Sequence, residues 1–571
     1  MFFIFLSFFI SSIFFFSIGA ISCKVLFSQN LNTSKNYYEF ALIGIISASI
    51  IAFLINFFSS LNRYVNDILF FFPILIILFN KKIRLELNLT KITSISLLVS
   101  VFSTILISYD NVYRPDAGLY HLPYISILNE NKIIIGLSNI HFRFGHASII
   151  QYVSALLNNH VLLDNGILIP SALIFCYVTL FLVEYLKKEK NKINILIFFL
   201  FLIFIFFRIN RYSSFGNDAP THFYFLYLIV LALDYKKNRD NLNHFFNKIS
   251  LVSIFIFFNK ITMFLCLFVP LYYFLNKNFL NLLKNKIFIF IIFIFFFWMG
   301  KNVLVSGCLS FPVEQTCIAS LEWFDKSETR RSNAISGRIE NEAWTKGAPH
   351  QQEKSFSEFI STYEWIDIWK DHAGKKIIKK ITPFSIFVLL TILYLLIFEK
   401  KKKIELINIK NRIIWFLIIL NLIGSLLWFI KFPVLRYGYG YLIGFFSISL
   451  SVILSSFIEI NLKKFKKKLK IVFFVFFIGL TIKHSLRIYE NLNVKNSPWP
   501  NIYSDAKENK KFENIPIIKD NVIIFYAPNP KLALCYYSKL NPCTHLVNSE
   551  FNYNDVKFQT IYGYKKFSFK E

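Results

Sequence analysis

A polar stretch around position 115 combines side-chain types that transfer protons and bind anions. It reads YDNVYRPDAGLYHLP over residues 109–123. Asp110 and Asp116 supply carboxylates, and Tyr120 and His121 follow Asp116 by about one helical turn, on the same side of a helix. Such a grouping of titratable side chains at one membrane face is typical of a functional site.

The same segment continues with further basic side chains. Residues 136–146 read GLSNIHFRFGH, which adds Arg143 and His146 as candidate binding residues. Four of the ten histidines of the chain, His160 included, fall in this segment. A simpler alternative stays open, in which Asp116 only caps a helix and the histidines are solvated loop residues.

A second polar segment reads RINRYSSFGNDAP over residues 208–220. Arg208 and Arg211 place positive charge on the membrane side that usually carries less of it, so an anion on that side could require them. Phosphate is a frequent partner of arginine. The alternatives are interfacial snorkelling for the arginines and helix capping for Asp218, with Pro220 near the first turn.

Further cations occur at the ends of apolar runs. Lys260 interrupts such a run in the string NKIT, and Lys431 and Arg436 belong to the turn KFPVLRYGYG. A lysine costs roughly 2.5–3.5 kcal/mol at the centre of a membrane helix and less near an interface. These cations could hold a lipid phosphate, although anchoring cations are also common at interfaces.

Long apolar runs must position all of these residues. The chain has 571 residues, 55% of them hydrophobic, and its runs can cross a hydrocarbon core of about 30 Å. Because they are continuously apolar rather than alternating, they predict helices. We expect an all-α polytopic membrane protein with about 13 to 14 transmembrane helices. The expected spans lie near residues 2–22, 39–58, 64–80, 93–109, 162–184, 193–208, 218–235, 247–259, 260–275, 286–306, 382–399, 412–430, 436–458 and 469–486.

Basic clusters between the runs predict the orientation. They are Lys81–Arg84, Lys187–Lys192, Lys236–Arg239, Lys277–Lys286, Lys400–Lys403 with Arg412, and Lys463–Lys470. Successive clusters are separated by two runs, so all of them can face the cytoplasm. The segments of interest predicted to face outward are 110–161, 209–217, 307–381, 431–435 and 487–571. We divide the chain into N-terminal transmembrane helices (1–90), a transmembrane core with outward loops (91–486) and an extracytoplasmic tail of small α/β character (487–571).

Two of the outward segments contain apolar or aromatic side chains. The stretch Ala147–Leu157 is too short to span, so we expect a helix along the interface or beneath other loops. The loop at 307–381 contains Trp344, Trp365 and Trp369. We expect amphipathic helices that cover the site, or contacts of the tryptophans with a sugar or with lipid head groups.

The net charge of +29 does not predict nucleic-acid binding, because the lysine clusters fall where the positive-inside rule expects them. They could also contact anionic lipid head groups. Four of the seven cysteines lie in outward segments. An oxidising compartment permits disulfides there, and the simplest pairs are Cys308 with Cys317 and Cys535 with Cys543, although unpaired thiols remain the alternative.

The layout resembles the GT-C superfamily of membrane glycosyltransferases, which take sugars from polyprenyl- or dolichyl-phosphate donors. In that group acidic residues follow the first and third core spans, as Asp110, Asp116 and Asp218 do here if the first three spans are an N-terminal addition. The strings DAGLYHLP and GLSNIHFRFGH, an SG-C-x-x-FP stretch, an FP-x-x-RYG turn and a paired-cysteine tail are similar to a bacterial GT-C-like membrane family. The resemblance covers roughly residues 90 to 545. The Asp-Glu pair of many GT-C enzymes is replaced by Asp110-Asn111 and Asp116-Ala117.

The resemblance implies an inverting glycosyl transfer with Asp116 as the general base and Asp110 in reserve. His121 and Tyr120 would orient the carboxylate or the acceptor. Arg436, with Lys260 or Arg211, would hold the leaving lipid phosphate. Asp218 would bind the acceptor or a divalent metal, Mg²⁺ or Mn²⁺, which is optional in this superfamily.

The implied partners are a polyprenyl-phosphate-linked sugar, a glycan or lipid acceptor, and membrane lipids. The implied location is a bacterial inner membrane with a periplasmic active face. A lipid-linked-sugar flippase or transporter is one alternative, which only the short pair 247–259 and 260–275 favours. An O-antigen ligase or polymerase is another. It would move the site to the loop residues Arg330, Arg338, His350 or His372.

Overall fold

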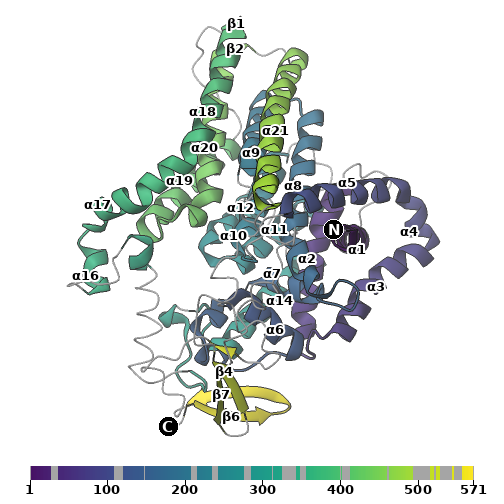
Figure 1. Cartoon of the computed structure of the whole chain (residues 1–571), viewed down its shortest axis with the longest axis vertical. Helices are drawn as coiled ribbons and strands as arrows, with labels where there is room; N and C mark the ends of the chain where they lie inside the picture. Colours follow the sequence, from purple (N-terminus) through teal and green to yellow (C-terminus); the bar gives the residue numbers. More distant parts are fainter. Residues whose placement is uncertain are drawn as a thin grey trace.

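The computed structural model is a bundle of helices with short strands near the C-terminus (Figure 1). It describes residues 2–27, 37–108, 120–146, 148–207, 215–234, 242–275, 285–311, 313–324, 342–347, 355–398, 400–401, 412–459, 462–492, 515–519, 522–526, 543–544 and 556–569.

The long helices follow the apolar runs. They are α1 (Phe2–Phe27), α2 (Tyr37–Asn56), α3 (Arg63–Phe79), α5 (Leu89–Ile107), α8 (Ile169–Lys188), α9 (Lys192–Phe207), α10 (Asp218–Leu233), α11 (Leu242–Asn259), α14 (Lys286–Ser306), α18 (Lys375–Phe398), α19 (Arg412–Lys431), α20 (Leu435–Phe457) and α21 (Leu462–Leu492). Within the described ranges, nine helices are long and apolar enough to cross a membrane. This count is compatible with a multi-pass membrane protein.

Short helices complete the connections between them. They are α4 (Lys81–Glu86), α6 (Leu122–Glu130), η2 (Leu137–Asn139), η3 (Phe142–His146), α7 (Ile149–Leu156), η4 (Leu163–Leu168), η7 (Ile261–Leu267), α12 (Phe268–Leu275), η8 (Glu314–Thr316), α16 (Phe356–Ser361), α17 (Trp365–Trp369) and η9 (Lys370–Gly374). The stretch expected to lie beneath other loops contains α7, whose eight residues are all buried. The expected pair at 247–275 is a long helix, α11, followed at Lys260 by the 3-10 turn η7 and the short α12.

The first two helices pack with their backbones in contact. A Cβ on Gly19 would lie 1.7 Å from the carbonyl oxygen of Phe40, and one on Gly44 would lie 2.0 Å from that of Phe15. Small residues at a helix–helix contact allow this approach, which is a common device in membrane bundles. Any larger side chain at Gly19 or Gly44 would push α1 and α2 apart.

Seven short strands are present among the described residues. They are β1 (Lys400–Lys401), β2 (Ile458–Glu459), β3 (Ile515–Lys519), β4 (Val522–Tyr526), β5 (Cys543–Thr544), β6 (Val556–Ile561) and β7 (Tyr564–Phe569). β3 pairs antiparallel with β4, and β4 pairs parallel with β5. The described part of the tail from residue 515 onward, which was expected to be α/β, thus consists of strands and their turns.

Strands β6 and β7 form a hairpin that is bound to the first loop segment. Its two-residue turn places Tyr562 and Gly563 at positive φ, as tight hairpins require. The Ile135 amide donates to the carbonyl of Lys565, and the Phe567 amide donates to the carbonyl of Ile135, both at 2.9 Å. In Figure 1 this hairpin lies at the lower end of the molecule, which we call the loop-rich end.

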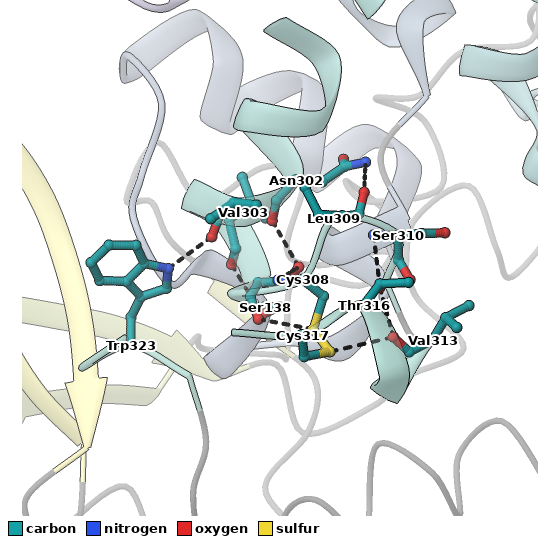
Figure 2. The surroundings of a disulfide bond; sticks show 12 residues. Ser138, Asn302, Val303, Cys308, Leu309, Ser310, Val313, Thr316, Cys317 and Trp323 are labelled. Atoms are coloured by element: carbon teal, nitrogen blue, oxygen red, sulfur yellow. Dashed lines mark hydrogen bonds between the residues drawn. A yellow bond between two sulfur atoms is a disulfide. The ribbon is translucent and has the colours of Figure 1, made fainter. Parts of the chain in front are cut away.

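A disulfide shapes the loop that follows α14. Gly307 ends this helix in the left-handed region, at φ 77°, and Cys308 pairs with Cys317 as expected (Figure 2). The indole of Trp323 then donates to the carbonyl of Val303 at 2.8 Å, which folds the loop back onto α14. Cys543 lies in β5, and Cys535 lies outside the described residues, so their pairing stays a prediction.

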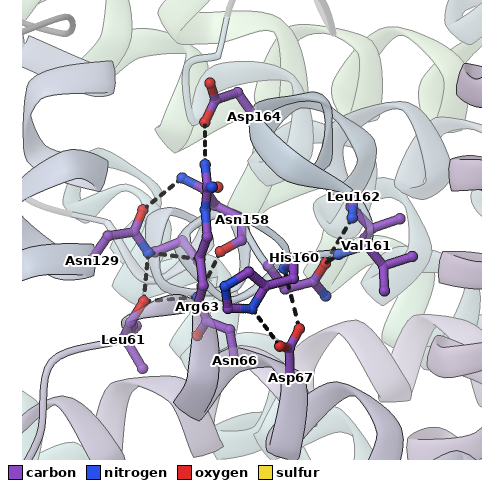
Figure 3. A network of polar contacts seen from close by, with 12 residues as sticks. Leu61, Arg63, Asn66, Asp67, Asn129, Asn158, His160, Val161, Leu162 and Asp164 are labelled. Carbon is purple, nitrogen blue, oxygen red and sulfur yellow. Dashed lines mark hydrogen bonds and ion pairs between the residues drawn. The ribbon is translucent and has the colours of Figure 1, made fainter.

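A polar network joins α3 to the loop before α8 (Figure 3). Asp67 accepts from both the backbone amide and the ring Nδ1 of His160, at 3.2 and 2.6 Å. Arg63 lies 3.6 Å from Asp164 on the same surface. His160 therefore belongs to a structural link at the loop-rich end, separate from the cluster described next.

Candidate functional site

Asp218 begins α10 and is bound by two cations from other segments. The ammonium of Lys260 bonds to its Oδ1, and Arg436 Nε lies 3.9 Å from its Oδ2. The side chains of Lys260, Asp218 and Arg436 are 9%, 19% and 20% exposed. Charges in such a poorly hydrated position interact more strongly than they would in water. Three candidates from distant parts of the sequence therefore meet, and we call them the Asp218 cluster.

Hydrogen bonds to the neighbouring segments fix the start of α10. Asn217 Nδ2 donates to the carbonyl of Asn259 at 2.5 Å. His222, one turn into the helix, contacts α20 through both ring nitrogens: Nε2 lies 2.8 Å from the carbonyl of Arg436, and the amide of Gly440 donates to Nδ1 at 3.1 Å. One donating and one accepting nitrogen fit a neutral imidazole with its proton on Nε2. His222 thus holds the backbone at Arg436 next to Asp218.

Aromatic rings border the two cations. Lys260 Nζ lies 4.1 Å from the ring centroid of Tyr437, and Arg436 Cζ lies 4.9 Å from the same centroid. The guanidinium also donates to the hydroxyl of Tyr437 at 3.0 Å. Trp344, from the large loop, lies 6.0 Å from Arg436 Cζ and is 50% exposed. Cation–π contacts of this kind hold the charges in place.

The first loop segment reaches the same region through α7. The Nδ1 atom of His121 lies 3.3 Å from Gln151 Nε2, and the adjacent Ile150 amide donates to Asn259 Oδ1 at 3.0 Å. Asn259 directly precedes Lys260. His121 is buried, with Tyr120 against its ring at 4.2 Å between centroids. The two predicted residues are thus connected to the Asp218 cluster indirectly, through α7 and Asn259.

Arg143 connects the first loop to the cluster. Its Cζ lies 4.9 Å from the ring centroid of Tyr120. Its charge is also close enough to act electrostatically on Tyr437, the ring that borders Lys260 and Arg436. His146 packs on Phe311 with 5.2 Å between ring centroids. The two sequence motifs GLSNIHFRFGH and SGCLSFP, which carry the family resemblance, are therefore in direct contact.

Several predicted residues fall outside the described part of the chain. They are Asp110, Asp116, Arg208, Arg211, Arg330, Arg338 and His350. The roles proposed for them stay predictions. His372 lies in η9, and Lys431 lies 3.7 Å from Glu342 with a 60% exposed side chain, outside the Asp218 cluster.

Sequence reasoning missed two residues that border the Asp218 cluster and one buried cation of α14. His222 reads as one polar residue in an apolar helix, and Tyr437 as one aromatic among many. Lys301 is a fully buried cation inside α14. A charged or imidazole side chain within an apolar run was the available signal, because such a side chain is costly unless it has a partner or a function.

The donor set around Asp218 does not fit a metal site. Among the described residues, no three His, Cys, Asp or Glu side chains lie together in a way that could hold an ion. Asp218 is already bonded to two cations, whose charge opposes a metal ion beside it. We therefore assign no step to Mg²⁺ or Mn²⁺.

Fold and site define a helical-bundle protein whose described part has nine helices long and apolar enough to cross a membrane, with a poorly hydrated ion cluster at its loop-rich end. The family model described as "Domain of unknown function (DUF8201)" matches residues 1–443, and the chain belongs to this family. No curated protein matches the chain. No solved structure matches it either.

Proposed function

We propose that this protein is a membrane glycosyltransferase that moves a sugar from a polyprenyl-phosphate donor to a cell-envelope acceptor at the loop-rich end. The observation that supports this most is the convergence of Lys260, Arg436 and Asp218 from three segments. Two cations side by side in a poorly hydrated position suit a phosphate, which binds arginine through paired hydrogen bonds and lysine through its point charge.

In the proposed reaction, the oxygen of an acceptor hydroxyl forms a bond to the anomeric carbon of the sugar. The bond from that carbon to the phosphate oxygen breaks, and the electron pair leaves with the lipid phosphate. Lys260 and Arg436 would stabilise this growing negative charge. Asp218 would hold the two cations in position before the donor arrives.

A base must take the proton of the acceptor hydroxyl. Asp218 is poorly suited, because its carboxylate already neutralises two cations. The resemblance to GT-C enzymes makes Asp116 the proposed base, and His121 and Tyr120 the residues that orient it. The buried position of His121 beside α7, which bonds to Asn259, supports a positioning role.

The proposed location is the inner membrane of a bacterium, with the loop-rich end in the periplasm. The arrangement of the basic clusters supports this orientation. Strand β1, which consists of Lys400 and Lys401, lies with β2 at the end of the molecule opposite the loop-rich end, at the top of Figure 1. A cytoplasmic face would be at this end.

The test is a transfer assay in vesicles, with a panel of polyprenyl-phosphate-linked sugars and labelled product. Lys260→Met and Arg436→Met should each lower turnover by about 10²–10³-fold, because each removes charge stabilisation from the leaving group. Lys431→Met is the matched control, since this exposed cation of the same α19–α20 turn lies outside the Asp218 cluster. It should keep wild-type turnover.

Asp116→Asn tests the base separately. It should abolish transfer and leave donor binding largely intact. Near-normal turnover in this variant would remove Asp116 from the mechanism. Equal turnover of the Lys260 and Arg436 variants and the Lys431 control would remove the phosphate site, and translocation of the donor without transfer would favour a flippase.

A further inference from the structure

Lys301 differs from every other buried lysine of the described chain. The structure buries four lysine residues in its described part: Lys248, Lys301, Lys346 and Lys566. Three of them bond to a glutamate, namely Lys248 to Glu39, Lys346 to Glu342 and Lys566 to Glu322. Lys301, with no exposed surface at all, forms no ion pair with a described carboxylate.

The contacts that Lys301 does form are weak ones for a buried charge. Its ammonium lies 3.2 Å from Asn302 Oδ1 and 4.5 Å from the ring centroid of Trp298. A single amide oxygen and a ring face replace only part of the hydration that an ammonium loses on burial. The remaining cost is unusual, because buried charges in proteins are normally paired.

Lys301 lies close to the loop-rich end of α14. It is five residues from the end of this helix at Ser306, which corresponds to roughly 8 Å along the axis. Trp298, the ring beneath it, stacks on Phe258 with 4.6 Å between centroids. Phe258 is the penultimate residue of α11, directly before Asn259 and Lys260. Lys301 therefore belongs to the same corner of the bundle as the Asp218 cluster.

The 3-10 helix η3, which contains Arg143 and His146, packs against α14, the helix that carries Lys301. Removal of His146 from bulk water by the surrounding protein lowers its pKa to about 4, and the charges of Arg143 and Lys301 act in the same direction. His146 keeps an exposed surface, whereas Lys301 has none. Arg143 acts on Tyr437 as well. The two neighbouring elements thus each carry a cation, Lys301 in α14 and Arg143 in η3.

We propose that Lys301, together with Arg143, forms a second anion site that takes a phosphate-type group of a molecule bound at the loop-rich end. A compact ammonium that lacks a carboxylate among the described residues is matched by a strongly charged, compact anion. The choice of a phosphate rather than another anion rests on the proposed function. The site itself rests on the burial and the partners of Lys301.

The experiment compares the thermal stability of the full chain in nanodiscs of neutral lipid, with and without three probes. The probes are inorganic pyrophosphate, farnesyl phosphate and farnesyl diphosphate. Each probe that binds the native protein should raise its melting temperature as its concentration rises. A response to pyrophosphate would identify the head group alone as sufficient, and a response only to the farnesyl compounds would identify a lipid carrier.

Lys301→Met is the diagnostic variant, because methionine fills a similar volume without the charge. Without a probe, it should melt at the wild-type temperature or above, since a costly charge is gone. With a probe, the apparent affinity should fall at least tenfold. Lys301→Gln is the second variant and should behave in the same way. Lys346→Met is the matched control: it removes a buried lysine that has a glutamate partner, so it should lower the melting temperature and keep the probe response.

Three results would each overturn the proposal. One is a loss of stability in both Lys301 variants without a probe, including variants too unstable to purify, because it would show that the ammonium has an internal counter-ion. The second is an unchanged probe response in both variants, and the third is no response of the wild-type protein to any probe. A protein that binds the probes through Lys301 and transfers no sugar would keep this site and remove only the proposed function.

Discussion

Two ion clusters occupy opposite ends of the bundle and have different surroundings. At the loop-rich end, the Asp218 cluster combines α10, η7 and α20, and half-exposed Trp344 lies beside it. At the other end, Lys248 bonds to Glu39 at 2.7 Å, and the hydroxyl of Tyr227 donates to the same carboxylate at 3.2 Å.

The two ion clusters differ in the structural elements that surround them. Glu39, Lys248 and Tyr227 come from α2, α11 and α10, and all three are buried in the packed helices. The Asp218 cluster instead lies at the first turns of α10 and α20 and at the start of η7, next to the half-exposed Trp344. A charge pair sealed between helices holds helices together, whereas a pair at helix ends can exchange its partners with a ligand. Four predictions test this comparison.

Glu39→Gln should have the largest effect on stability, a loss of about 3–5 kcal/mol. The reason is that it leaves the ammonium of Lys248 buried without its carboxylate. Denaturation in mild detergent measures the loss. The double variant Glu39→Gln/Lys248→Met should recover much of it. If the Glu39→Gln protein is as stable as the wild type, the Glu39–Lys248 pair does not hold the helices together.

Removal of the disulfide should have the next largest effect. Cys308→Ser/Cys317→Ser should cost about 2–3 kcal/mol, because a loop with a sequence separation of 9 is no longer closed in the unfolded chain. Reductant should lower the melting temperature of the wild type more than that of the variant, which keeps only the predicted Cys535–Cys543 pair. Cys176→Ala, at a buried free thiol, serves as the control for the reductant. It should respond to reductant as the wild type does.

Asp218→Asn should destabilise less than Glu39→Gln, by about 1–2 kcal/mol, because Asp218 and Arg436 keep some contact with solvent. Its functional effect should be the larger one. Without the carboxylate, Lys260 and Arg436 lose the partner that positions them for a donor phosphate. Measurements of donor affinity, turnover and stability together distinguish the functional role of the Asp218 cluster from the structural role of the Glu39–Lys248 pair. An Asp218→Asn protein with full turnover would show that the Asp218 cluster has no such functional role.

Trp344→Ala should leave stability almost unchanged, because half of the side chain is exposed. We expect a rise in KM of about fivefold, equivalent to about 1 kcal/mol, as a ring face beside Arg436 is lost. Trp344→Phe should restore part of the affinity. Trp415→Ala removes another exposed tryptophan, on the apolar helix α19, and should not change KM.

The helices were largely predictable, because hydrophobic length determines them. The runs around residues 2–22, 286–306 and 436–458 became α1, α14 and α20 with small shifts of their ends. The double crossing at 247–275 was less predictable. Lys260 breaks that run, and the chain continues as a tight turn that delivers the lysine to Asp218.

The sequence predicted which residues belong to the site, but not which of them contact one another. Charged residues at the ends of apolar runs, such as Lys260 and Arg436, stand out in a sequence because hydrocarbon excludes them. Their pairing with Asp218 depends on helix packing, which single-sequence patterns do not encode. The docking of the hairpin on Ile135 was not expected for the same reason.

That hairpin has a consequence for how the chain is made. Asn139, in the first loop segment, donates to the carbonyl of Phe567, and 428 residues separate the two. At synthesis rates of about 5–20 residues per second, the backbone of Ile135 waits roughly 20–90 s for its partner strand. During that interval the backbone amide and carbonyl of Ile135 lack their partners, in the loop that also carries His121 and Arg143, and are available to a chaperone or to another copy of the same unfinished chain.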